Sequence, residues 1–413
     1  MATAADPAPA SEWRTNWPLM AACLFGLSTS SIAPYALGQF MAPLEQEFSW
    51  TRTEVSAGLS VSLALGFFAQ PVVGWLVDRF NARWLAIPGL LMIIVAFWGF
   101  SQATDNLVLW IALWSFNAIA TAIIGPTIWA AVVSGAFVKH RSAAIAVSLC
   151  GVNLATAFAP AVARLLLDAY GWRAAFQLLG LIWAVPALVL AFFFFFDKRD
   201  LSARSPARQN AAGEPSRKAT RPVFFSSTFV RLALAVAISG TVTAAFTMHL
   251  APALMDKGIE ATIAATIAGA AGFGSVVGKL TMGSLFDRLG TGRLGALNMG
   301  LFALASLLLA LDSPNLPLAL VASALIGGTS GANFALFTVA ANKLFDTAVF
   351  GTVYGTLMSV SALSSAIGPL AVAYVFDESG SYAPAFLGGI VIAIVTALLL
   401  QRLTPVTLEE SPA

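Results

Sequence analysis

The sequence contains few charged residues. Asp, Glu, Lys and Arg make up only 10% of the 413 residues, whereas 58% are hydrophobic and the mean hydropathy is +0.83. Soluble proteins carry about 25% charged residues, so this composition excludes a soluble enzyme and a nucleic-acid-binding protein. A chain this apolar is not intrinsically disordered either. The composition therefore predicts a protein that crosses a membrane several times.

Cysteine is also scarce. The two cysteines, Cys23 and Cys150, lie far apart in apolar stretches, which provides neither a disulfide framework nor the spacing of a metal site. The sequence has no evident grouping of nucleophile, base and metal ligands, so we expect no enzymatic activity, no metal and no cofactor. The polar N-terminus lacks the basic region and cleavage site of a signal peptide, and the first apolar run is expected to remain as a span.

Long apolar runs recur along the chain. A transmembrane helix needs about 20 apolar residues, and six such runs precede and six follow a polar, basic segment at 197–228, which is predicted to be a flexible cytoplasmic linker. The prediction is an all-α membrane protein with twelve transmembrane helices in two six-helix bundles, formed by residues 1–196 and 229–413. The predicted spans are 17–43, 53–77, 84–104, 107–134, 142–167, 174–196, 229–253, 261–286, 292–311, 316–341, 349–375 and 383–402.

The distribution of Lys and Arg predicts the orientation. With a cytoplasmic N-terminus, only Arg52, Arg173 and Lys257 fall in outer loops, and the remaining loop cations fall in cytoplasmic segments. Positive residues concentrate on the cytoplasmic side of membrane proteins, so both termini are predicted to be cytoplasmic. We expect a monomeric, multi-pass protein of the inner, or plasma, membrane in contact with lipid.

The two halves of the chain repeat. GWLVDRFNAR at 74–83 and GSLFDRLGTG at 283–292 align at an offset of 209 residues, and the same offset pairs Asp168 with Asp377. One offset across several spans predicts two units of like orientation. The charged residues of these phrases are candidates for gating ion pairs, with ordinary cytoplasmic anchors as the alternative; they are Asp78, Arg79, Arg83, Asp287 and Arg288.

The doubled phrase and the central linker resemble the major facilitator superfamily of secondary transporters over essentially the whole chain. Asn81 stands where glycine is usual in the phrase. The resemblance implies the major facilitator fold and transport by alternating access between the two bundles.

The predicted spans lack carboxylates in their interior, and their central ionisable groups are basic. Lys279 lies eight residues before Asp287 in the eighth span, about 12 Å from its cytoplasmic end. A charge near mid-membrane costs about 2.5–3.5 kcal/mol, which indicates that Lys279 has a functional role. The hypothesis is that its ammonium faces a water-filled cavity and binds an anionic group; the alternative is snorkelling to the interface. The repeat pairs Lys279 with Gln70, which is predicted to donate to the same substrate, unless it only bridges helices.

Other polar residues in the spans are weaker candidates. Asn153 is a buried amide that needs a partner or a ligand. His249 is either a titrating, proton-coupling group or a bridge between helices, and Arg164 with Asp168 has the spacing of an ion pair within one helix. Further substrate-binding candidates, each with helix packing as the alternative, are Tyr35, Trp129, Asn333 and Tyr354.

Two pairs of segments resemble the monocarboxylate transporter and oxalate/formate exchanger branch: AFVKHRSAAIAVSLCG with DAYGWRAAF, and MHLAPALMDKGI with GKLTMGSLFDRLG. The resemblance implies that Lys279 binds the substrate carboxylate at a position where the branch has arginine, and that His249 matches a branch histidine. Lysine keeps the charge without the bidentate fork of arginine. Tyr35 and Ser275 stand where animal monocarboxylate carriers have a lysine and an acid, and the absence of a cation from 349–375 favours a monoanion.

The sequence therefore predicts a secondary transporter of small organic anions, foremost monocarboxylates, that works by alternating access. Proton symport and anion exchange both remain open, and His249 or a desolvated Lys279 are the candidates for a proton site. The alternative function is efflux of apolar or drug-like compounds. A membrane sensor that does not transport is disfavoured, because no signalling domain is apparent.

Overall fold

The computed structural model describes residues 12–137, 141–196, 224–311, 315–345, 350–401 and 403. Nearly all of these described residues are helical, and no strand occurs among them. The predicted linker lies outside the described residues up to position 223. The helices are α1 (Glu12–Thr29), α2 (Ile32–Phe48), α3 (Arg52–Arg79), α4 (Ala82–Ser101), α5 (Leu107–Ile123), α6 (Pro126–Ala136), α7 (Arg141–Leu149), α8 (Gly151–Phe194), α11 (Ser227–Asp256), α12 (Ala261–Ala310), α13 (Leu316–Leu344), α14 (Phe350–Ser365), α15 (Ile367–Ser379) and α16 (Ala383–Gln401).

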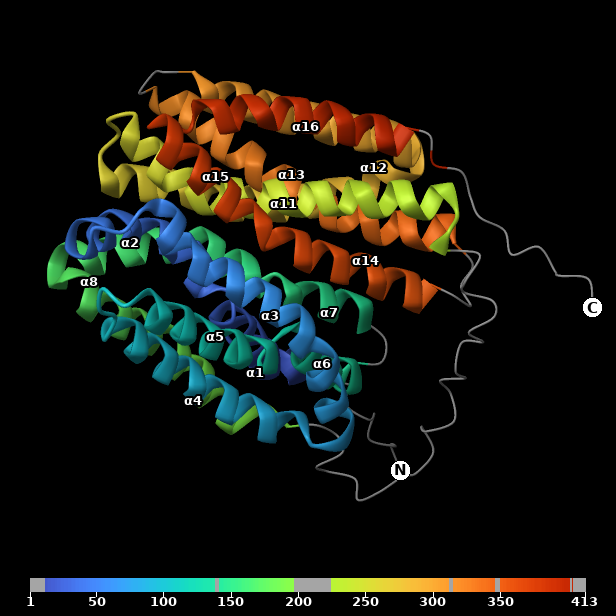
Figure 1. Ribbon diagram of the computed structural model, residues 1–413. Helices are drawn as coiled ribbons and strands as arrows, with labels where there is room; N and C mark the ends of the chain where they lie inside the picture. The colour runs from blue at the N-terminus through green and yellow to red at the C-terminus, as the bar shows by residue number, and fades with distance from the viewer. Residues whose placement is uncertain are drawn as a thin grey trace, which may run out of the picture.

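Two of these helices contain a non-helical glycine between two spans. At Gly171 in α8 and Gly290 in α12, φ is 77° and 71°, a left-handed conformation that glycine adopts without a Cβ clash. Gly380 follows Gly171 by the repeat offset of 209 residues and also has a positive φ, 67°. The α8 and α12 helices therefore each supply two consecutive spans (Figure 1).

Several other spans consist of two helices separated by a short non-helical break. In the described chain, nine segments are by themselves long and apolar enough to cross a membrane, and one of them, Val147–Phe194, contains two spans. The α3 helix and the α5–α6 pair complete the set of twelve. The predicted fold class is thus confirmed, with breaks inside spans at 30–31, 124–125, 150 and 366.

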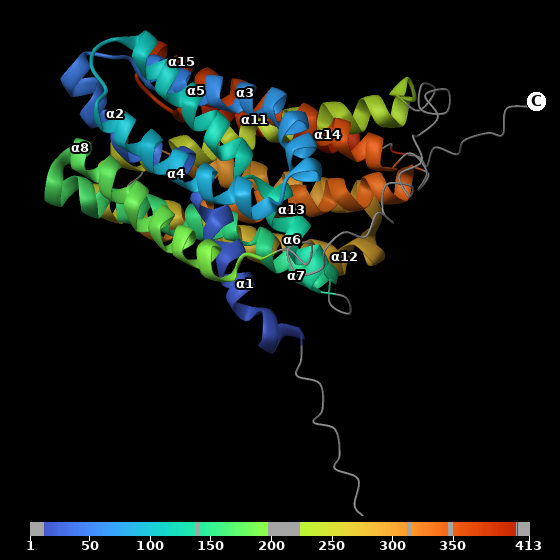
Figure 2. The ribbon, with the colours of Figure 1, turned by 90° about the horizontal axis from the view of Figure 1, so that it is seen from below.

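Helices α1–α8 form one bundle and α11–α16 form the other (Figures 1 and 2). In the first bundle, the rings of Phe40 and Phe176 stack with their centroids 3.8 Å apart. In the second, the Phe246 ring lies 5.2 Å from Phe302 and 5.0 Å from Phe386. Because lipid tails are as apolar as these side chains, close packing rather than exclusion from water holds such helices together.

Glycines let α12 and α13 pack backbone against backbone. A Cβ built on Gly278 would overlap the carbonyl oxygen of Gly328, and one built on Gly331 would overlap that of Ser275. Small residues permit this close approach in membrane helices. The contact holds in place the part of α12 that carries Lys279.

Replacing Gly278 by alanine is expected to lower the melting temperature of the purified protein by about 5 °C, because the two helices must separate to admit the methyl group. Gly300→Ala is the matched control. Gly300 is exposed in the second span of α12, beyond the break at Gly290, and no neighbouring atom lies within 4 Å of the place that an alanine methyl group would take. Alanine is also the better helix former, so this control should melt at or slightly above the wild-type temperature. Equal melting of Gly278→Ala and wild type in detergent would contradict the packing argument.

The two bundles contact each other closely in one half of the molecule. Gly38 of α2 lies against the Met248 carbonyl and the Pro252 ring of α11. Gly272 of α12 lies against the backbone of Ala157 in α8. These contacts leave no room for a side chain between the bundles there.

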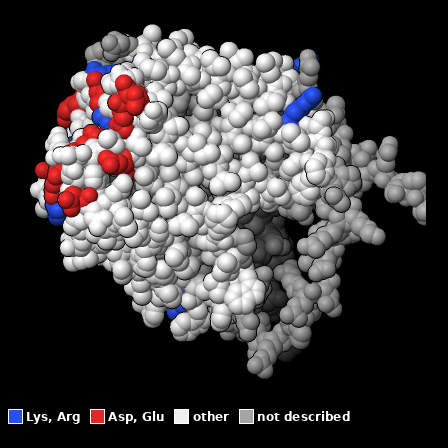
Figure 3. Space-filling model, viewed as in Figure 1, with Lys and Arg blue, Asp and Glu red and all other residues white. Residues whose placement is uncertain are grey.

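Acidic residues gather at the end of the molecule nearest these contacts (Figure 3). We call it the acidic end and define it by Glu45, Glu47, Asp168, Asp256 and Asp377, which lie near the ends of α2, α11 and α15 and, for Asp168, just before the break at Gly171 in α8. The space-filling surface is hollowed in the other half of the molecule (Figure 3). The bundles are therefore closed toward the acidic end.

Candidate functional site

A cavity of about 710 Å³ lies between the two bundles and takes its lining from both. In α3, which begins at the acidic end, the lining residue is Phe67, just past the middle of the helix. In α14, which begins at the opposite end, the lining runs from Tyr354 to Ala362. The main cavity therefore extends from the middle of the molecule into the half remote from the acidic end.

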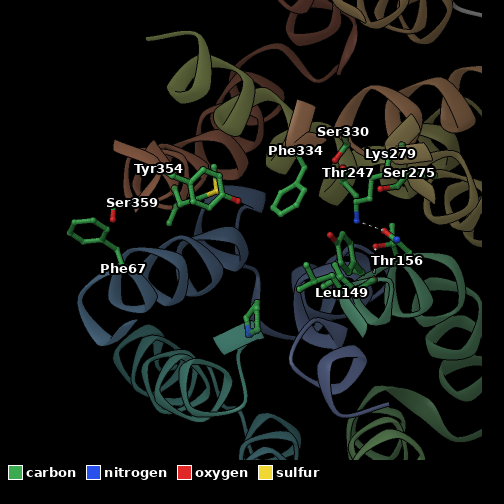
Figure 4. A pocket seen from close by; sticks show the side chains of 18 of the residues that line it. Phe67, Leu149, Thr156, Thr247, Ser275, Lys279, Ser330, Phe334, Tyr354 and Ser359 are labelled. Carbon is green, nitrogen blue, oxygen red and sulfur yellow. Dashed lines mark hydrogen bonds between the residues drawn. The ribbon is translucent and has the colours of Figure 1, made fainter. Parts of the chain in front are cut away.

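Lys279 supplies a positive charge to this cavity (Figure 4). Among the described residues that line it, no other is cationic and none is a carboxylate. The Lys279 ammonium donates a hydrogen bond of 3.3 Å to Oδ1 of Asn153, and it lies 5.7 Å from the centroid of the Phe334 ring. The Nδ2 atom of Asn153 is buried without a partner in the described part of the chain. The ammonium and this amide together can hold a carboxylate, with two donors for its two oxygens.

The fold brings Lys279 and Asn153 together by the crossing of α8 and α12. Asn153 lies one helical turn before Ala157, and Lys279 lies two turns after Gly272. Because Ala157 and Gly272 touch, the two polar side chains on the same faces meet across the gap between bundles.

Aromatic side chains make up much of the remaining wall. Tyr35, Phe67, Phe334 and Tyr354 all line the cavity. Figure 4 shows Phe67 and Tyr354 on the side opposite Lys279, and Phe334 lies between this pair and Lys279. The Tyr354 hydroxyl accepts a hydrogen bond of 3.3 Å from Thr338. The cavity thus combines a cationic end with an apolar, aromatic body.

Two smaller cavities adjoin the main one. A second, of about 410 Å³, shares Tyr35, Phe334 and other residues with it. A third, of about 220 Å³, shares Phe67, Pro126 and Ala362 with it. The shared walls make the three cavities parts of one central space.

The predicted substrate-binding residues divide into four groups. Lys279, Asn153, Tyr35 and Tyr354 line the main cavity, so the structure brings these four together. Asn333 lines the second cavity instead, and its Oδ1 accepts a hydrogen bond of 2.8 Å from Asn298. The predicted partner of Lys279 on α3, Gln70, has a side chain that lies outside the described parts.

Trp129 lies apart from these cavities. Its side chain is fully buried in the first bundle, where Nε1 donates a hydrogen bond of 2.7 Å to the carbonyl of Ile124. Its ring lies 4.7 Å from that of Phe195 and occupies the space beside Gly26. These contacts are those of a packing residue, the alternative that the sequence left open.

His249 is fully buried and lines none of the three cavities. Its Nε2 lies 2.9 Å from the carbonyl oxygen of Pro369, which only accepts, so Nε2 carries the proton. Nδ1 therefore accepts from the Tyr382 hydroxyl at 3.0 Å. These bonds satisfy a neutral imidazole and tie α11 to α15 and to the start of α16.

The basic gating candidate with a described side chain, Arg83, makes its contacts within the first bundle. Its guanidinium donates a hydrogen bond of 2.6 Å to the carbonyl of Phe192 and lies 4.2 Å from the centroid of the Phe196 ring. Arg83 thus joins the start of α4 to the end of α8. The side chains of the other four gating candidates, Asp78, Arg79, Asp287 and Arg288, lie outside the described parts.

Arg164 pairs with Asp168 one turn further along α8, at the acidic end. The Arg164 Nε atom lies 2.8 Å from Asp168 Oδ2. This is the ion pair within one helix that the spacing predicts.

Arg52 joins the two bundles at the acidic end. Its guanidinium contacts Glu45 of its own bundle at 3.0 Å, and it reaches Asp256 of the other bundle at 2.8 Å. It also donates a hydrogen bond of 2.7 Å to the Tyr382 hydroxyl and lies 3.6 Å from the centroid of the Phe376 ring. One side chain thus links α2 and α3 to α11, α15 and α16. We call Arg52 with Glu45, Asp256, Asp377 and Tyr382 the Arg52 cluster.

Asp377 adds a second link between the bundles. Its carboxylate accepts from the backbone N–H groups of Arg52 and Thr53 at 3.1 and 2.9 Å, and from the Thr53 hydroxyl. A carboxylate at a helix N-terminus is favoured because it satisfies free N–H groups and faces the positive end of the helix dipole. The second bundle thereby caps α3 of the first.

Burial raises the pKa of the Tyr382 hydroxyl. The phenol therefore stays protonated and can donate to His249 while it accepts from Arg52. The Arg52 cluster is in this way connected to the buried histidine.

Sequence reasoning did not identify the Arg52 cluster. A signal was available, because Arg52 is one of three cations in predicted outer loops and Asp377 is the repeat partner of Asp168. Neither signal shows that the two residues meet, since they lie 325 positions apart.

Comparisons with known proteins agree with this architecture. The sequence model of the Major Facilitator Superfamily matches residues 19–369 and 232–413. Monocarboxylate transporter 11 of Homo sapiens is 26% identical over 405 residues, covering 93% of this chain and 82% of the relative. Monocarboxylate transporter 13 of Bos taurus is 26% identical over 393 residues, covering 94% and 88%.

A solved structure has a similar fold at low sequence identity. The crystal structure of the nucleoside transporter NupG superimposes with a TM-score of 0.77 at 12% identity, covering 94% of this chain and 99% of that one. At this identity the likeness concerns the arrangement of helices alone.

Proposed function

The chain belongs to the Major Facilitator Superfamily and is a multi-pass membrane transporter, and from this premise we propose that it carries small organic anions, foremost monocarboxylates. The relatives named above are monocarboxylate transporters. Their names alone do not define the cargo of a chain that is only 26% identical.

The observation that carries the proposal is the environment of Lys279. Its ammonium borders a cavity whose described lining contains no carboxylate, so the positive charge has no counter-ion among those residues. A buried cation without a counter-ion is costly, and an anionic substrate would compensate that cost. One cation matches one negative charge, which favours monocarboxylates over dicarboxylates.

The conformation fits one stage of alternating access. By the distribution of Lys and Arg, the acidic end faces away from the cytoplasm. The Arg52 cluster and the close contacts of α2 with α11 then close the outer side, while the cavity lies toward the cytoplasm. We therefore assign this structure to an inward-facing stage in the plasma membrane.

The coupling remains a choice between proton symport and anion exchange. His249 has both ring nitrogens occupied by neutral hydrogen bonds in this closed outer half. Opening of the outer side would break the contact between Arg52 and Tyr382, and Tyr382 is the residue that donates a hydrogen bond to His249. If protons are coupled, His249 takes up its proton in the outward-facing stage.

The apolar walls of the cavity favour a second candidate function, efflux of apolar compounds. Such cargo would use the aromatic side chains and would not need Lys279. The two functions differ in whether transport depends on a negative charge of the cargo.

Uptake into proteoliposomes tests the proposal. Labelled monocarboxylates, matched dicarboxylates and neutral amides of the same carbon skeletons are supplied with and without an inward proton gradient. We expect saturable transport of the monocarboxylates and little of the other two classes. Stimulation of uptake by the proton gradient indicates symport. Uptake that occurs only into vesicles preloaded with an organic anion indicates exchange. Transport of the amides at the rate of the acids would contradict the proposal and favour efflux of apolar compounds.

A further inference from the structure

The third cavity forms a recess at the edge of the first bundle, largely apolar but with several polar side chains in its wall. It lies mainly between α3 and α5 and takes Ser30, Ser62, Trp114, Asn117 and Thr121 among its lining residues. No charged residue is found in its described lining. We call this recess the Asn117 subsite.

Asn117 has an unused acceptor in this recess. The side chain is 2% exposed, and its Oδ1 has no hydrogen-bond partner among the described residues. An unpaired polar group in the membrane interior costs several kcal/mol in general, so such groups are normally paired with protein, water or ligand. The Asn117 amide oxygen therefore marks a place where a hydrogen-bond donor belongs, and the indole N–H of Trp114, which lines the same recess and also has no partner among the described residues, can donate in return.

The neighbouring hydroxyl groups also offer acceptors. Thr121 uses its proton on the carbonyl of Asn117 at 2.9 Å, and Ser30 uses its proton on the carbonyl of Leu27 at 2.7 Å. Their oxygens keep free lone pairs. Because the described lining offers no carboxylate to balance an ammonium group, a neutral donor suits the recess better than a cation.

The Asn117 subsite adjoins the main cavity at the end remote from Lys279. Phe67 and Pro126 line both spaces. In Figure 4, Phe67 and Lys279 lie on opposite sides of the main cavity. A single ligand can therefore place a carboxylate at Lys279 and a second group at Asn117, with an apolar body between the aromatic side chains.

We propose that the cargo is a monocarboxylate that carries a neutral hydrogen-bond donor, such as a hydroxyl group, at the end remote from its carboxylate, and that Asn117 recognises this group. The inference rests on the proposed function for the carboxylate end. It adds the chemistry of the distal end, which excludes short acids such as lactate as the best substrates.

Competition against a transported monocarboxylate in proteoliposomes tests the inference. The probes are 3-phenylpropanoate, its 4-hydroxyphenyl and 4-methoxyphenyl analogues, and the neutral compound 4-propylphenol. For the wild type we expect the hydroxylated acid to compete about tenfold more strongly than the other two acids. The methoxy analogue separates donation of a hydrogen bond from mere size.

Asn117→Leu is expected to abolish the tenfold preference while it leaves competition by 3-phenylpropanoate unchanged or stronger. Asn117→Ser retains an acceptor and should keep part of the preference. The melting temperatures of the serine and leucine variants in detergent show whether each variant is folded. Ser115→Ala is the matched control, because Ser115 lies on the same helix, bonds to the Ile111 carbonyl and lines none of the three cavities.

The outcomes separate this inference from the proposed function. Equal competition by the hydroxylated and plain acids overturns the inference and leaves monocarboxylate transport standing. Equal weakening of all acids by Asn117→Leu also overturns it. If no monocarboxylate is transported, binding of 4-propylphenol to the purified protein is measured by thermal shift; a shift that Asn117→Leu removes keeps the donor subsite while the carboxylate proposal fails.

Discussion

Replacing Lys279 by glutamine is expected to lower kcat/KM for monocarboxylate transport about 10- to 100-fold. Hydrogen bonds to charged groups contribute about 1.5–3 kcal/mol, and each 1.4 kcal/mol corresponds to a factor of ten in binding. Glutamine can still donate one hydrogen bond, but it removes the charge that compensates the carboxylate. Initial rates of labelled uptake over a range of substrate concentrations provide the measurement.

Two companion variants sharpen the Lys279 experiment. Lys279→Arg keeps the charge and adds a planar pair of donors suited to a carboxylate, so it should retain transport within a few-fold of wild type. Lys343→Gln removes a lysine that is exposed near the end of α13 and lines none of the cavities, and it should transport normally. Undiminished monocarboxylate transport by Lys279→Gln would refute the anion site and leave the efflux alternative.

Arg52→Gln is expected to shift the conformational equilibrium toward an outward-open state by about 30-fold. Arg52 is the cation that Glu45 and Asp256 both contact, and Asp377 lies beside it. Its removal leaves three carboxylates facing one another across the two bundles. Breaking a buried ion pair costs about 3–5 kcal/mol. Since this cluster is only partly buried, with 35% of the Asp256 side chain exposed, screening reduces the effect to about 2 kcal/mol.

Distances between spin labels can follow this opening. Labels at Thr104 and Glu378, both exposed near the acidic end but in different bundles, report the separation of the bundles in a background without Cys23 and Cys150. We expect a longer distance to gain population in Arg52→Gln and an intermediate shift in Arg52→Lys, because an ammonium cannot contact all partners of the guanidinium at once.

The ion pair of Arg164 with Asp168 offers a matched control for the Arg52 experiment. It lies at the same end of the molecule but joins two residues of one helix, so Arg164→Gln should leave the distance distribution of the labels unchanged. If Arg164→Gln and Arg52→Gln widen the distribution equally, general loss of charge is the cause and the Arg52 cluster is not a latch.

The part of the candidate site that could be predicted from sequence is the part that depends on local composition. Lys279 stands out because a cation inside an apolar span is costly wherever the neighbouring helices lie. Asn153 stands out for a similar reason, as an amide that needs a partner. Their mutual contact could not be predicted, because it depends on the crossing of α8 and α12 at Ala157 and Gly272.

Trp129 shows how composition alone can mislead about position. An aromatic residue in the fourth span is equally compatible with a cavity wall and with the bundle interior. The break at 124–125 turns the start of α6, and the Trp129 indole then bonds to the carbonyl that this break leaves free, that of Ile124. The rotation of a helix about its own axis decides which side its residues face, and no local pattern in this almost uniformly apolar stretch encodes it.

The sequence by itself determined the membrane class, the twelve spans, the repeated halves and the presence of one lysine deep in a span that lacks acids. Each of these follows from the free energy of placing particular side chains in lipid or water, which acts residue by residue. Only the tertiary structure decided which polar groups meet: Lys279 with Asn153, Arg52 with the carboxylates of the other bundle, and the amide oxygen of Asn117, unpaired among the described residues, with a recess beside the main cavity. Those contacts join helices far apart in the chain, and they depend on the packing of backbones against small residues, which a single apolar sequence permits in many registers.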